Sequence, residues 1–374
     1  MSTPPPDQGS GSTPHRRRPR YAGTHPRSFD QRYKERNADQ FPDIEAHVRA
    51  QGRTPAGTHV PIMVAEILDA LRPAPGEIVA DLTLGHGGHA LAFIERTAPN
   101  GLLIGLDLDG PQLELTRQRL TQTVDPTRFQ LFNSHFAGLP KLLSTNGIAG
   151  VDILFADLGL SSMQIDNPAR GFSYKLDGPL DMRMDARRPR TAADVLRTIS
   201  LQELSTALQD LADEPEHRQV AEAILRRRSE RAMTRTSELA DVVLNAKGWT
   251  RQTWSAAVAK EKSELHPAAR TFQTLRILVN DELQGLEQLL RVAPSCLNPG
   301  GRVGILTFHS GEDRRVKHAL RDGLRDGIYG QIADDPIRPG PVERRDNPRS
   351  SPAKFRWAMR KMVESDQRPE ALAG

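Results

Sequence analysis

A glycine-rich loop is the first feature of the sequence that could do chemistry. Residues 81–90 read Asp-Leu-Thr-Leu-Gly-His-Gly-Gly-His-Ala and follow a short apolar segment that predicts a strand. Glycines at such a place let the backbone approach a ligand at the start of a helix, which indicates a nucleotide-like cofactor. The pattern Gly85-x-Gly87-x-x-Ala90, with Asp107 about 20 residues on, also satisfies the dinucleotide fingerprint. The loop alone therefore fits either of two cofactors, and a tight turn that binds no ligand is a third alternative.

A carboxylate, Asp81, stands four positions before Gly85 at the end of this strand. A carboxylate there attracts a ligand with a cationic amino-acid end and repels a pyrophosphate. S-adenosylmethionine has such an end, so it is the favoured cofactor, and a nicotinamide dinucleotide is the alternative. Around His86 and His89 the sequence has no Cys, Asp or Glu cluster that would complete a metal site, so no metal is predicted. We expect His89 at the start of the next helix, in contact with the cofactor.

A second acidic position, Asp157, ends another predicted strand and precedes Leu158-Gly159-Leu160. In an open α/β sheet ligands bind outside the carboxyl ends of the strands, so Asp157 is expected to face a ligand; a helix cap or turn is the alternative. Methylation of carbon 5 of a pyrimidine requires a covalent cysteine adduct, and the single cysteine, Cys296, lies away from every predicted ligand loop. An exocyclic amine is therefore the favoured nucleophile, with Asp157 accepting its hydrogen bond.

Strands and helices alternate around these residues. Short apolar segments separated by helical patterns of roughly ten residues predict a parallel sheet with right-handed crossovers. A helical pattern over residues 60–71 ends before the first strand, and further helices are predicted through residue 96 and over 111–120. The predicted strands are residues 77–81, 102–107, 129–132, 151–156 and 301–308.

The alternation stops after Asp157 and resumes only near residue 301. Residues 192–232 have apolar side chains at helical spacing, and residues 271–292 predict one long helix. We therefore predict that an α-helical insertion splits the sheet domain. Residues 355–359 alternate weakly and predict a closing antiparallel edge strand, which Trp357 helps to pack.

Composition excludes several classes of protein. The chain has 374 residues, 37% of them hydrophobic, which is enough for two domains. No apolar run reaches the roughly 18–20 residues of a membrane span, and residues 1–20 contain no apolar segment typical of a secretory signal. A single cysteine excludes an intrachain disulfide scaffold and a thiolate metal site. The sequence therefore predicts a cytoplasmic protein.

Basic residues gather at the two ends of the chain. Residues 1–57 hold ten Lys or Arg against six Asp or Glu, and residues 314–361 hold thirteen against six. A polyanionic partner fits this distribution, because Lys and Arg displace counterions from phosphates; solvated tails that aid solubility are the alternative. Residues 1–57 also contain eight prolines and few apolar side chains, so they are predicted to be a disordered basic arm.

Several segments taken in order resemble one known family, the bacterial 16S ribosomal RNA cytosine-N4 methyltransferases of the RsmH/MraW type. The resemblance covers residues 59–359. The segments that carry it are residues 81–89, 157–164, 171–173, 177–185, 266–273, 307–314 and 347–351.

The resemblance implies a fold and an activity. The fold is a Rossmann-like methyltransferase core interrupted by an all-helical domain, and the cofactor is S-adenosylmethionine. The activity is methylation of N4 of a cytidine at rRNA position 1402, in the decoding centre, on a base flipped out of its stack. The implied partner is 16S rRNA or the small ribosomal subunit, with no membrane, and a homodimer is left open.

The resemblance also implies roles for single residues. Asp107 takes the ribose hydroxyls and Phe136 lies beside the adenine. Asp157 and Gln164 reach the methionine end or the target base, and Asp157 is the candidate catalytic residue. The implied cofactor contacts are Gly87, Gly88, His89, Asp107, Phe136, Asp157 and Gln164.

The chain departs from the family pattern at Leu84, His86 and Gly311, where common members have Phe, Arg and Leu. These changes are expected to leave the loop backbone intact and to alter local packing. The chain also lacks the Asp/Asn-Pro-Pro-aromatic tetrapeptide of many amino-methyltransferases, so the ring that stacks on the flipped base is open between Phe172 and Tyr174.

The predicted domain organisation combines these observations. It consists of a disordered basic arm (1–57), a first part of the methyltransferase core (58–165), an α-helical insertion domain (166–270), a second part of the core (271–361) and a flexible tail (362–374).

Charged residues outside the loops have predicted roles as well. Asp177, Asp181 and Asp185 are expected to organise Arg183 or the docking of the insertion. The basic C-terminal side chains are expected to hold RNA phosphates without reading sequence; they are Arg314, Arg315, Lys317, Arg344, Arg345 and Arg349.

Other functions remain as alternatives. His309 and Ser310 with Asp313 suggest a hydrolase, but the sequence has no Gly-x-Ser-x-Gly elbow, so a cap or substrate-edge role is favoured. A nicotinamide oxidoreductase leaves the basic C-terminal region unexplained, and a non-catalytic RNA-binding protein leaves the glycine loop and Asp107 without a purpose.

Overall fold

The computed structural model describes residues 61–260 and 265–362. They belong to one compact unit that begins at Thr58. The predicted arm, residues 1–57, and all of the predicted tail except Met362 lie outside the described residues. Among the described helices, none is long and apolar enough to cross a membrane.

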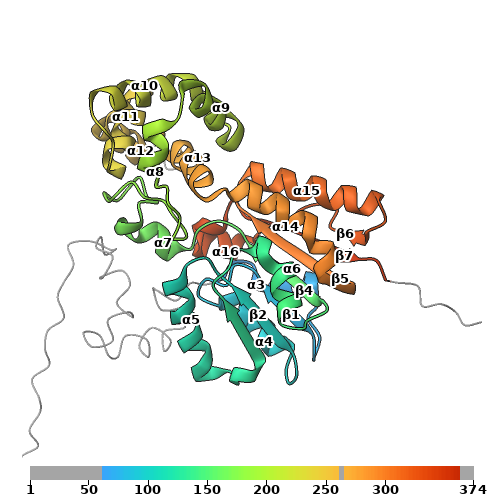
Figure 1. The fold of residues 1–374 in the computed structure, drawn as a ribbon. Coiled ribbons are helices and arrows are strands. Elements are labelled where there is room, and N and C mark those ends of the chain that lie inside the picture. The colour runs from blue at the N-terminus through green and yellow to red at the C-terminus, as the bar shows by residue number, and fades with distance from the viewer. Residues whose placement is uncertain (1–60, 261–264, 363–374) are drawn as a thin grey trace, which may run out of the picture. The chain divides into compact units, whose positions relative to one another are not determined.

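In the described part of the chain, seven strands form one sheet in the order β3-β2-β1-β4-β5-β7-β6 (Figure 1). Neighbours from β3 to β5 are parallel, whereas β7 runs antiparallel to β5 and to β6. The predicted α/β class with a parallel-dominated sheet is confirmed. The strands are β1 (Ile78–Asp81), β2 (Leu102–Leu106), β3 (Phe129–Phe132), β4 (Val151–Asp157), β5 (Leu297–Thr307), β6 (Tyr329–Ile332) and β7 (Lys354–Arg360).

Helices pack on both faces of the sheet because the side chains of β4 alternate between two cores. Ile153 and Phe155 lie in one core, and Leu154 and Ala156 lie in the other. Successive side chains of a strand point to opposite faces, so a strand buried on both sides is apolar throughout. The first core includes α3 (Val64–Leu71), α4 (Gly88–Arg96) and α5 (Gly110–Thr123); the second includes α6 (Leu139–Thr145), α14 (Glu282–Cys296) and α15 (Ser310–Arg325).

The described residues between β4 and β5 are mainly helical and share a third core, which joins Leu208 and Ile224 to Phe272. The region predicted as helical, 192–232, contains three helices because Ser200 and Asp213 interrupt it. Ser200 accepts the Glu203 N–H as a cap, and Asp213 ends the same helix with φ 49°. The helices are α7 (Ser162–Asp166), α8 (Ala192–Thr198), α9 (Leu201–Ala212), α10 (His217–Glu230), α11 (Thr236–Ala246), α12 (Arg251–Lys260) and α13 (Ala269–Asn280).

The prediction of a single helix over residues 271–292 is wrong, because the helix is interrupted at Asp281. Asp281 has φ 51°, a left-handed conformation that ends α13 and begins α14. Phe272 and Leu275 of α13 pack in the third core, although the predicted boundary at residue 270 assigns them to the sheet domain. The domain boundaries themselves remain a prediction.

The strand predicted over residues 355–359 is antiparallel, as expected, but it is not the edge strand of the sheet. It forms β7 and pairs antiparallel with β5, but β6 lies outside it and takes the edge. Trp357 packs, partly buried, against the first core, as predicted. The chain after β6 forms α16 (Pro341–Asp346), and short 3-10 helices occur at Pro126–Arg128, Phe136–Gly138, Pro168–Arg170 and Pro348–Ser350.

Candidate cofactor and catalytic site

Three aspartates stand at the carboxyl ends of three adjacent parallel strands. Asp81 ends β1, Asp157 ends β4 and Asp107 directly follows β2. The pairing register places Asp81 opposite Gly105 of β2 and Phe155 of β4, so the three ends lie at one edge of the sheet. This is the edge at which open α/β sheets bind ligands. The structure therefore brings the predicted acidic residues together.

The glycine loop after β1 is folded back onto Asp107. The Oδ2 atom of Asp107 accepts the Gly85 N–H at 2.7 Å, and its Oδ1 atom accepts the Asp109 N–H at 2.8 Å. Carboxylate oxygens accept more than one hydrogen bond, so Asp107 can still take the ribose hydroxyls predicted for it. Burial is the main reason why the pKa of Asp107 is raised to about 6.

Gly87 and Gly88 begin α4 in a crowded place. Gly87 has φ 73°, and a Cβ atom there would lie 3.0 Å from Cγ2 of Thr116. A Cβ atom at Gly88 would lie 2.9 Å from Cγ of Pro61. Glycine at these positions thus permits both the left-handed turn and the close packing, and it leaves the start of α4 beside the strand ends.

Asp81 is buried, whereas the Asp157 side chain is partly buried, with 17% of its surface exposed. Within residues 61–260 and 265–362, no Lys or Arg side chain forms an ion pair with either carboxylate. Burial, followed by the charges of Asp81 and Glu312, raises the pKa of Asp157 to about 8. Burial also raises the pKa of Asp81 to about 7, against the hydrogen bond from the Thr83 N–H at 3.1 Å. Buried carboxylates with raised pKa values favour a cationic ligand, because a nearby positive charge restores their ionised form. The site thus fits a cofactor with an ammonium or sulfonium group.

His89 lies in the first turn of α4 and is turned toward β4. Its Nδ1 atom is 3.8 Å from Oδ2 of Asp157, and its ring centroid is 4.8 Å from that of Phe155. Its Nε2 atom lies 2.9 Å from the Ile62 carbonyl oxygen. His89 therefore borders Asp157, and its contact with the cofactor remains a prediction.

Gln164 joins the loop after β4 to the loop after β2. Its side chain forms a capping box with Ser161 at the start of α7, and its Nε2 atom donates to Oδ2 of Asp109 at 3.3 Å. Asp109 also receives the Arg170 guanidinium at 2.6 Å. These bonds bring Gln164 to the same edge as Asp107, so the predicted site residues of both loops are neighbours.

Phe136 lies in the segment that follows β3, the strand next to β2 in the sheet. The Asp107 N–H donates to the Phe132 carbonyl at 3.2 Å, which sets the end of β3 beside the end of β2. The Phe136 ring lies 4.1 Å from the ring of His135. A Cβ atom at Gly285 would be 2.7 Å from His135, so this glycine lets α14 pack against the segment. The placement is compatible with the predicted position beside the adenine.

A buried ion network next to Asp157 was not predicted from the sequence. Glu312 accepts the Phe308 N–H at 2.9 Å, and its Oε1 atom lies 3.0 Å from Nε2 of His309. Arg276 donates two hydrogen bonds to Glu282, at 2.8 and 2.9 Å. Burial alone would raise the pKa of Glu312, but the contact with His309 and the charge of Arg276 lower it. Arg276 and Glu282 are distant from Glu312 in the sequence, so no local pattern predicted this network. The one indication was that Glu312 lies in a segment that carries the family resemblance.

The arrangement around His309 does not resemble a hydrolase site. Ser310 donates to Oδ2 of Asp213 at 2.6 Å, whereas the His309 ring faces Glu312. Asp313 is bound to Lys354 at 2.8 Å and to Arg356 at 2.6 Å. His309 occupies the N-cap position of α15, as predicted, but its side chain makes no capping bond there.

The two rings predicted to stack on a flipped base are engaged elsewhere. Phe172 is buried in the third core and lies under the Arg170 guanidinium, 5.8 Å from its carbon. Tyr174 is stacked on His266, with 4.3 Å between ring centroids. A third ring, Phe308, is partly buried and lies 3.7 Å from the position that a Cβ atom at Gly159 would take. Phe308 is thus the aromatic side chain beside the loop that follows Asp157.

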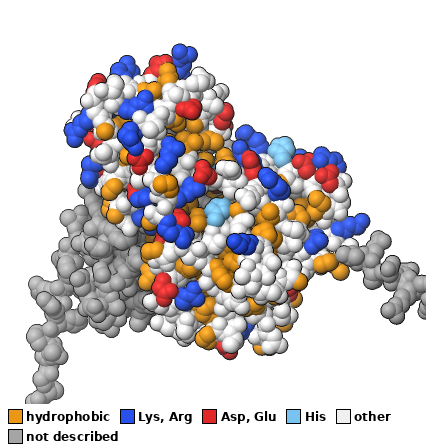
Figure 2. Space-filling view, viewed as in Figure 1, with side chains coloured by type: hydrophobic (Ala, Val, Ile, Leu, Met, Phe, Trp, Pro, Cys, Tyr) orange, Lys and Arg blue, Asp and Glu red, His pale blue; other side chains and the backbone are white. Residues whose placement is uncertain are grey.

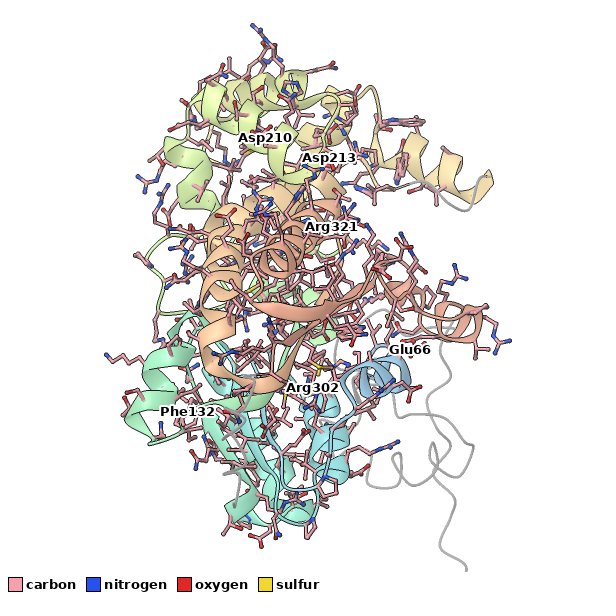
Figure 3. The ribbon with its side chains drawn as sticks, turned by 90° about the vertical axis from the view of Figure 1, so that its right-hand side faces the viewer. Glu66, Phe132, Asp210, Asp213, Arg302 and Arg321 are labelled. Carbon is pink, nitrogen blue, oxygen red and sulfur yellow. The ribbon has the colours of Figure 1, made fainter. Side chains whose placement is uncertain are left out.

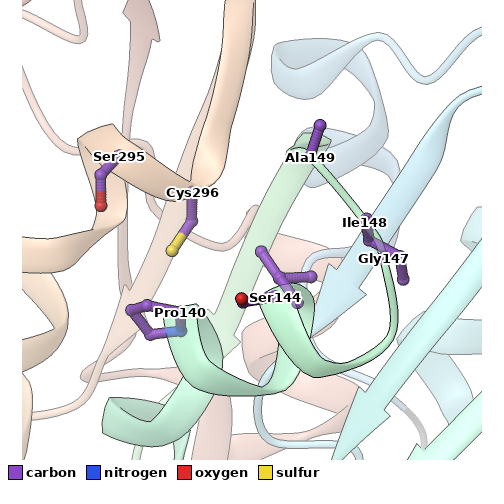
Figure 4. A pocket seen from close by; sticks show the side chains of 8 residues that line it. Pro140, Ser144, Gly147, Ile148, Ala149, Ser295 and Cys296 are labelled. Carbon is purple, nitrogen blue, oxygen red and sulfur yellow. The ribbon is translucent and has the colours of Figure 1, made fainter.

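Cys296 lies at the other end of the sheet. It is buried at the end of α14, ahead of β5, and borders a shallow pocket with Ser144 and Pro140 of α6 (Figure 4). Burial raises the pKa of its thiol. The predicted small, buried role of Cys296 is confirmed. Within the described residues there is also no group of three or more His, Cys, Asp or Glu side chains that could hold a metal ion.

Comparison with known proteins gives one consistent result. Residues 56–361 match the model of the MraW methylase family. A protein of Agathobacter rectalis named ribosomal RNA small subunit methyltransferase H 1 is 41% identical over 353 residues, which cover 92% of this chain and 98% of that protein. A ribosomal RNA small subunit methyltransferase H of Acidothermus cellulolyticus is 42% identical, over 81% of this chain and 94% of that protein.

These matches decide between the cofactors that the glycine loop left open. S-adenosylmethionine, the methyl donor of the predicted family, is confirmed as the cofactor. The carboxylate-lined strand ends, the tight glycine loop and the matched range of residues agree with one another. We conclude that the chain belongs to the MraW methylase family.

Proposed function

We propose that this protein methylates the N4 amine of a cytidine in 16S rRNA, at position 1402 of the decoding centre, within the small ribosomal subunit and in the cytoplasm. The names of the relatives support small-subunit rRNA as the substrate. The observation that carries the chemistry is Asp157, a partly buried carboxylate at the ligand edge with a pKa raised to about 8.

When bound, S-adenosylmethionine supplies an electrophilic methyl group and a positive charge. Gly87, Gly88 and Asp107 would hold its nucleoside part, and Asp81 would hold its ammonium end, since each lies at the carboxyl ends of β1 and β2. Asp157 would lie nearest the reacting atoms. This assignment uses only groups that the structure brings to one edge.

The proposed role of Asp157 follows from the chemistry of the amine. The lone pair of an exocyclic amine is drawn into the pyrimidine ring, so the amine is a weak nucleophile until an acceptor holds its protons. In its ionised form Asp157 accepts a hydrogen bond from N4 and then the proton that N4 loses. A pKa near neutrality suits both parts of that task, because the group must give up and regain a proton within one cycle.

The target cytosine would leave its stack to reach this edge, as in other enzymes that act on bases. Phe308 is the ring best placed to face it, because it lies beside Gly159 in the loop after Asp157. Basic side chains of α15, α16 and the following turn would hold phosphates on either side. Some of them already have partners within the chain; for example, Arg315 lies 2.8 Å from Glu287, and Arg349 lies 2.9 Å from Asp166. Figure 2 shows one face of the molecule, on which Lys and Arg side chains are spread with Asp and Glu between them.

The test uses small ribosomal subunits that lack the modification. The purified chain and methyl-labelled S-adenosylmethionine are added, and the rRNA is digested and analysed by mass spectrometry. We expect N4-methylcytidine at one position of the decoding centre. Label on another nucleoside would contradict the proposed target, and absence of label from rRNA would contradict the substrate.

A further inference from the structure

A second pocket lies in the helical part, away from the strand ends. It has a volume of about 290 Å³, and three aromatic side chains line it, Trp249, Trp254 and His266, together with Arg270. We call it the aromatic pocket. Its residues come from the segment after α11, from α12 and from the segment that leads into α13. The segment around His266 carries part of the family resemblance, yet nothing in the proposed reaction uses it.

The rings of the aromatic pocket form a connected cluster. Trp254 is buried and meets Trp249 and His266 edge to face, at centroid distances of 5.3 and 5.6 Å. Tyr174 continues the cluster by stacking on His266 at 4.3 Å. Trp249 and His266 are only half-buried, so two of the rings present surface to the pocket. Burial, followed by the charges of Lys175 and Arg251, lowers the pKa of His266 to about 4, so its ring is neutral at pH 7.

Arg270 adds a positive charge to the pocket. Its guanidinium donates to the Asp213 carbonyl at 2.7 Å, and no Asp or Glu side chain of the described residues forms an ion pair with it. Lys247 differs, because it is neutralised by Glu214 at 2.7 Å and lies 3.7 Å from Glu216. Half-exposed rings beside a guanidinium suit a nucleotide, whose base stacks and whose phosphate is anionic.

A series of neighbouring residues leads from the loop after Asp157 toward the aromatic pocket. Asp166 ends α7 and binds Arg349 at 2.9 Å. Arg349 is close enough to Tyr174 for its charge to act on the phenol, and Tyr174 stacks on His266 of the pocket. A positive charge is thus present near both the loop and the pocket.

A second chain of contacts links the pocket to the end of β5. Arg270 holds the Asp213 carbonyl, and the Asp213 side chain accepts the Ser310 hydroxyl at 2.6 Å. Asp213 is seen in Figure 3 at the end of α9. Ser310 follows His309, beside the buried network of Glu312. These hydrogen bonds join the aromatic pocket to the residues that follow β5.

We propose that the aromatic pocket binds one unpaired nucleotide of the RNA substrate, with its base against Trp249 and His266 and its phosphate on Arg270. This inference rests on the proposed function, because it assumes that RNA reaches the strand ends. The pocket then anchors a nucleotide at a distance from the methylated cytidine. Such an anchor adds affinity for unpaired RNA and leaves binding of the cofactor unchanged.

The test measures RNA binding by the full chain without turnover. The probes are a fluorescein-labelled single-stranded decaribonucleotide and the same sequence in a duplex. Trp249→Ala removes a half-exposed ring, Trp249→Phe retains an aromatic face, and Val258→Ala truncates an exposed apolar side chain of α12 outside the pocket as the control. A base stacked on an aromatic ring contributes about 1–3 kcal/mol, so we expect Trp249→Ala to raise the Kd for the single strand by roughly tenfold.

The remaining variants should bind in a graded way. Trp249→Phe should stay within about threefold of the unmodified chain, and Val258→Ala should not differ from it. Arg270→Gln should weaken binding and lower the slope of log Kd against log salt by about one phosphate contact. Binding of S-adenosylmethionine should be unchanged in all of them.

Equal affinity of the unmodified chain and Trp249→Ala for the single strand would overturn the proposal. If Trp249→Ala is not folded, unchanged binding and salt slope in Arg270→Gln would overturn it instead. Methyl transfer to small subunits by the unmodified chain tests the proposed function separately. Transfer without any effect of the pocket variants would therefore contradict this inference alone, whereas absence of transfer to rRNA would contradict the proposed function.

Discussion

Two groups of aspartates in this molecule have opposite surroundings. The strand-end pair consists of Asp81, which is buried, and Asp157, which is partly buried. Their removal from solvent raises the pKa values of the two carboxyl groups to about 7 and about 8. The loop aspartates, Asp177, Asp181 and Asp185, each bind an arginine, at 2.6 to 2.9 Å, and each has a lowered pKa. Among the described residues, the same side chain thus has no Lys or Arg partner at one place and is paired with arginine at the other.

This difference distinguishes carboxylates that face a ligand from carboxylates that stabilise the fold. An arginine partner stabilises a folded loop, and the loop aspartates organise Arg183, Arg187 and Arg235 in this way, as predicted for Arg183. A buried carboxylate without such a partner destabilises the fold, so its position is better explained by a ligand. Four experiments would break or sharpen this comparison.

The largest effect is expected from Asp157→Asn. The amide keeps the shape of the side chain but cannot accept the proton that N4 loses, so kcat should fall by about 10²–10⁴-fold. RNA affinity should persist, and the chain should be no less stable, because a neutral amide replaces a carboxyl group whose ionisation the site disfavours. Methyl incorporation into small subunits measures the first effect, and probe binding and thermal melting measure the others.

The matched control for this variant is Asp69→Asn. Asp69 is exposed on α3 and lies outside the candidate site. Its variant should retain full activity. An Asp157→Asn variant as active as this control would remove Asp157 from the mechanism, and parallel loss of RNA binding would assign it a structural role.

The second experiment concerns the pH dependence of cofactor affinity. The raised pKa values mean that Asp81 and Asp157 hold protons below about pH 7 in the free chain. A cationic ligand favours the ionised carboxylates, so protons compete with it. The affinity for S-adenosylmethionine should therefore rise between pH 6 and pH 8.5, by at most about tenfold per pH unit for each proton released.

Isothermal titration calorimetry in two buffers of different ionisation enthalpy would count the released protons. Asp157→Asn should release fewer protons and show a shallower pH dependence. A Kd that stays constant over this range would mean that the strand-end pair is already ionised, and the contrast with the loop aspartates would then disappear.

The strand-end pair could be predicted from the sequence because each member ends a short apolar run. Asp81 directly follows the apolar residues 78–80 and Asp157 directly follows the apolar residues 153–156, and such runs are typical of strands buried on both faces. Parallel strands bring their carboxyl ends to one edge, so sequence order alone placed the two residues together. The position of Phe136, by contrast, came only from the family resemblance.

The partners of other charged residues could not be predicted, since they depend on where distant elements meet. Arg276 and Glu282 lie on either side of the break at Asp281, and a left-handed aspartate in an apolar periodic region gives little local signal. The strand β6 was missed because Tyr329–Ile332 is short and contains Gly330 and Gln331, so it shows no clear alternation. Contacts of this kind are set by tertiary packing.

The third experiment removes a loop carboxylate. Asp181 accepts three hydrogen bonds from Arg183, one from its N–H and two from its guanidinium at 2.7 and 2.8 Å. Burial would raise the pKa of Asp181, but these bonds outweigh it and lower the pKa. Asp181→Asn should reduce the free energy of unfolding by about 1–2 kcal/mol and leave the Kd for S-adenosylmethionine unchanged.

Chemical denaturation at pH 7 and at pH 3 would measure this change. Because the pKa of Asp181 is lowered in the folded chain, its contribution is present above the unfolded pKa of about 4 and is lost as the pH falls through the folded value. The difference between the unmodified chain and Asp181→Asn should shrink accordingly at low pH. An altered cofactor affinity would instead place Asp181 with the functional group.

The smallest effect is expected at Asp177, whose partner is also exposed. Arg235 donates to Oδ2 of Asp177 at 2.6 Å, and this bond lowers the pKa of Asp177 to about 2, yet both side chains are about half accessible to solvent. Solvent screens such a pair, so Asp177→Asn should destabilise the chain by less than about 1 kcal/mol, and less still at high salt. Denaturation at low and high ionic strength would measure this difference. A loss comparable to that of Asp181→Asn would show that the Ser237 N–H, which donates to Oδ1 of Asp177 at 3.3 Å, is the contact that matters, because salt does not screen a backbone hydrogen bond.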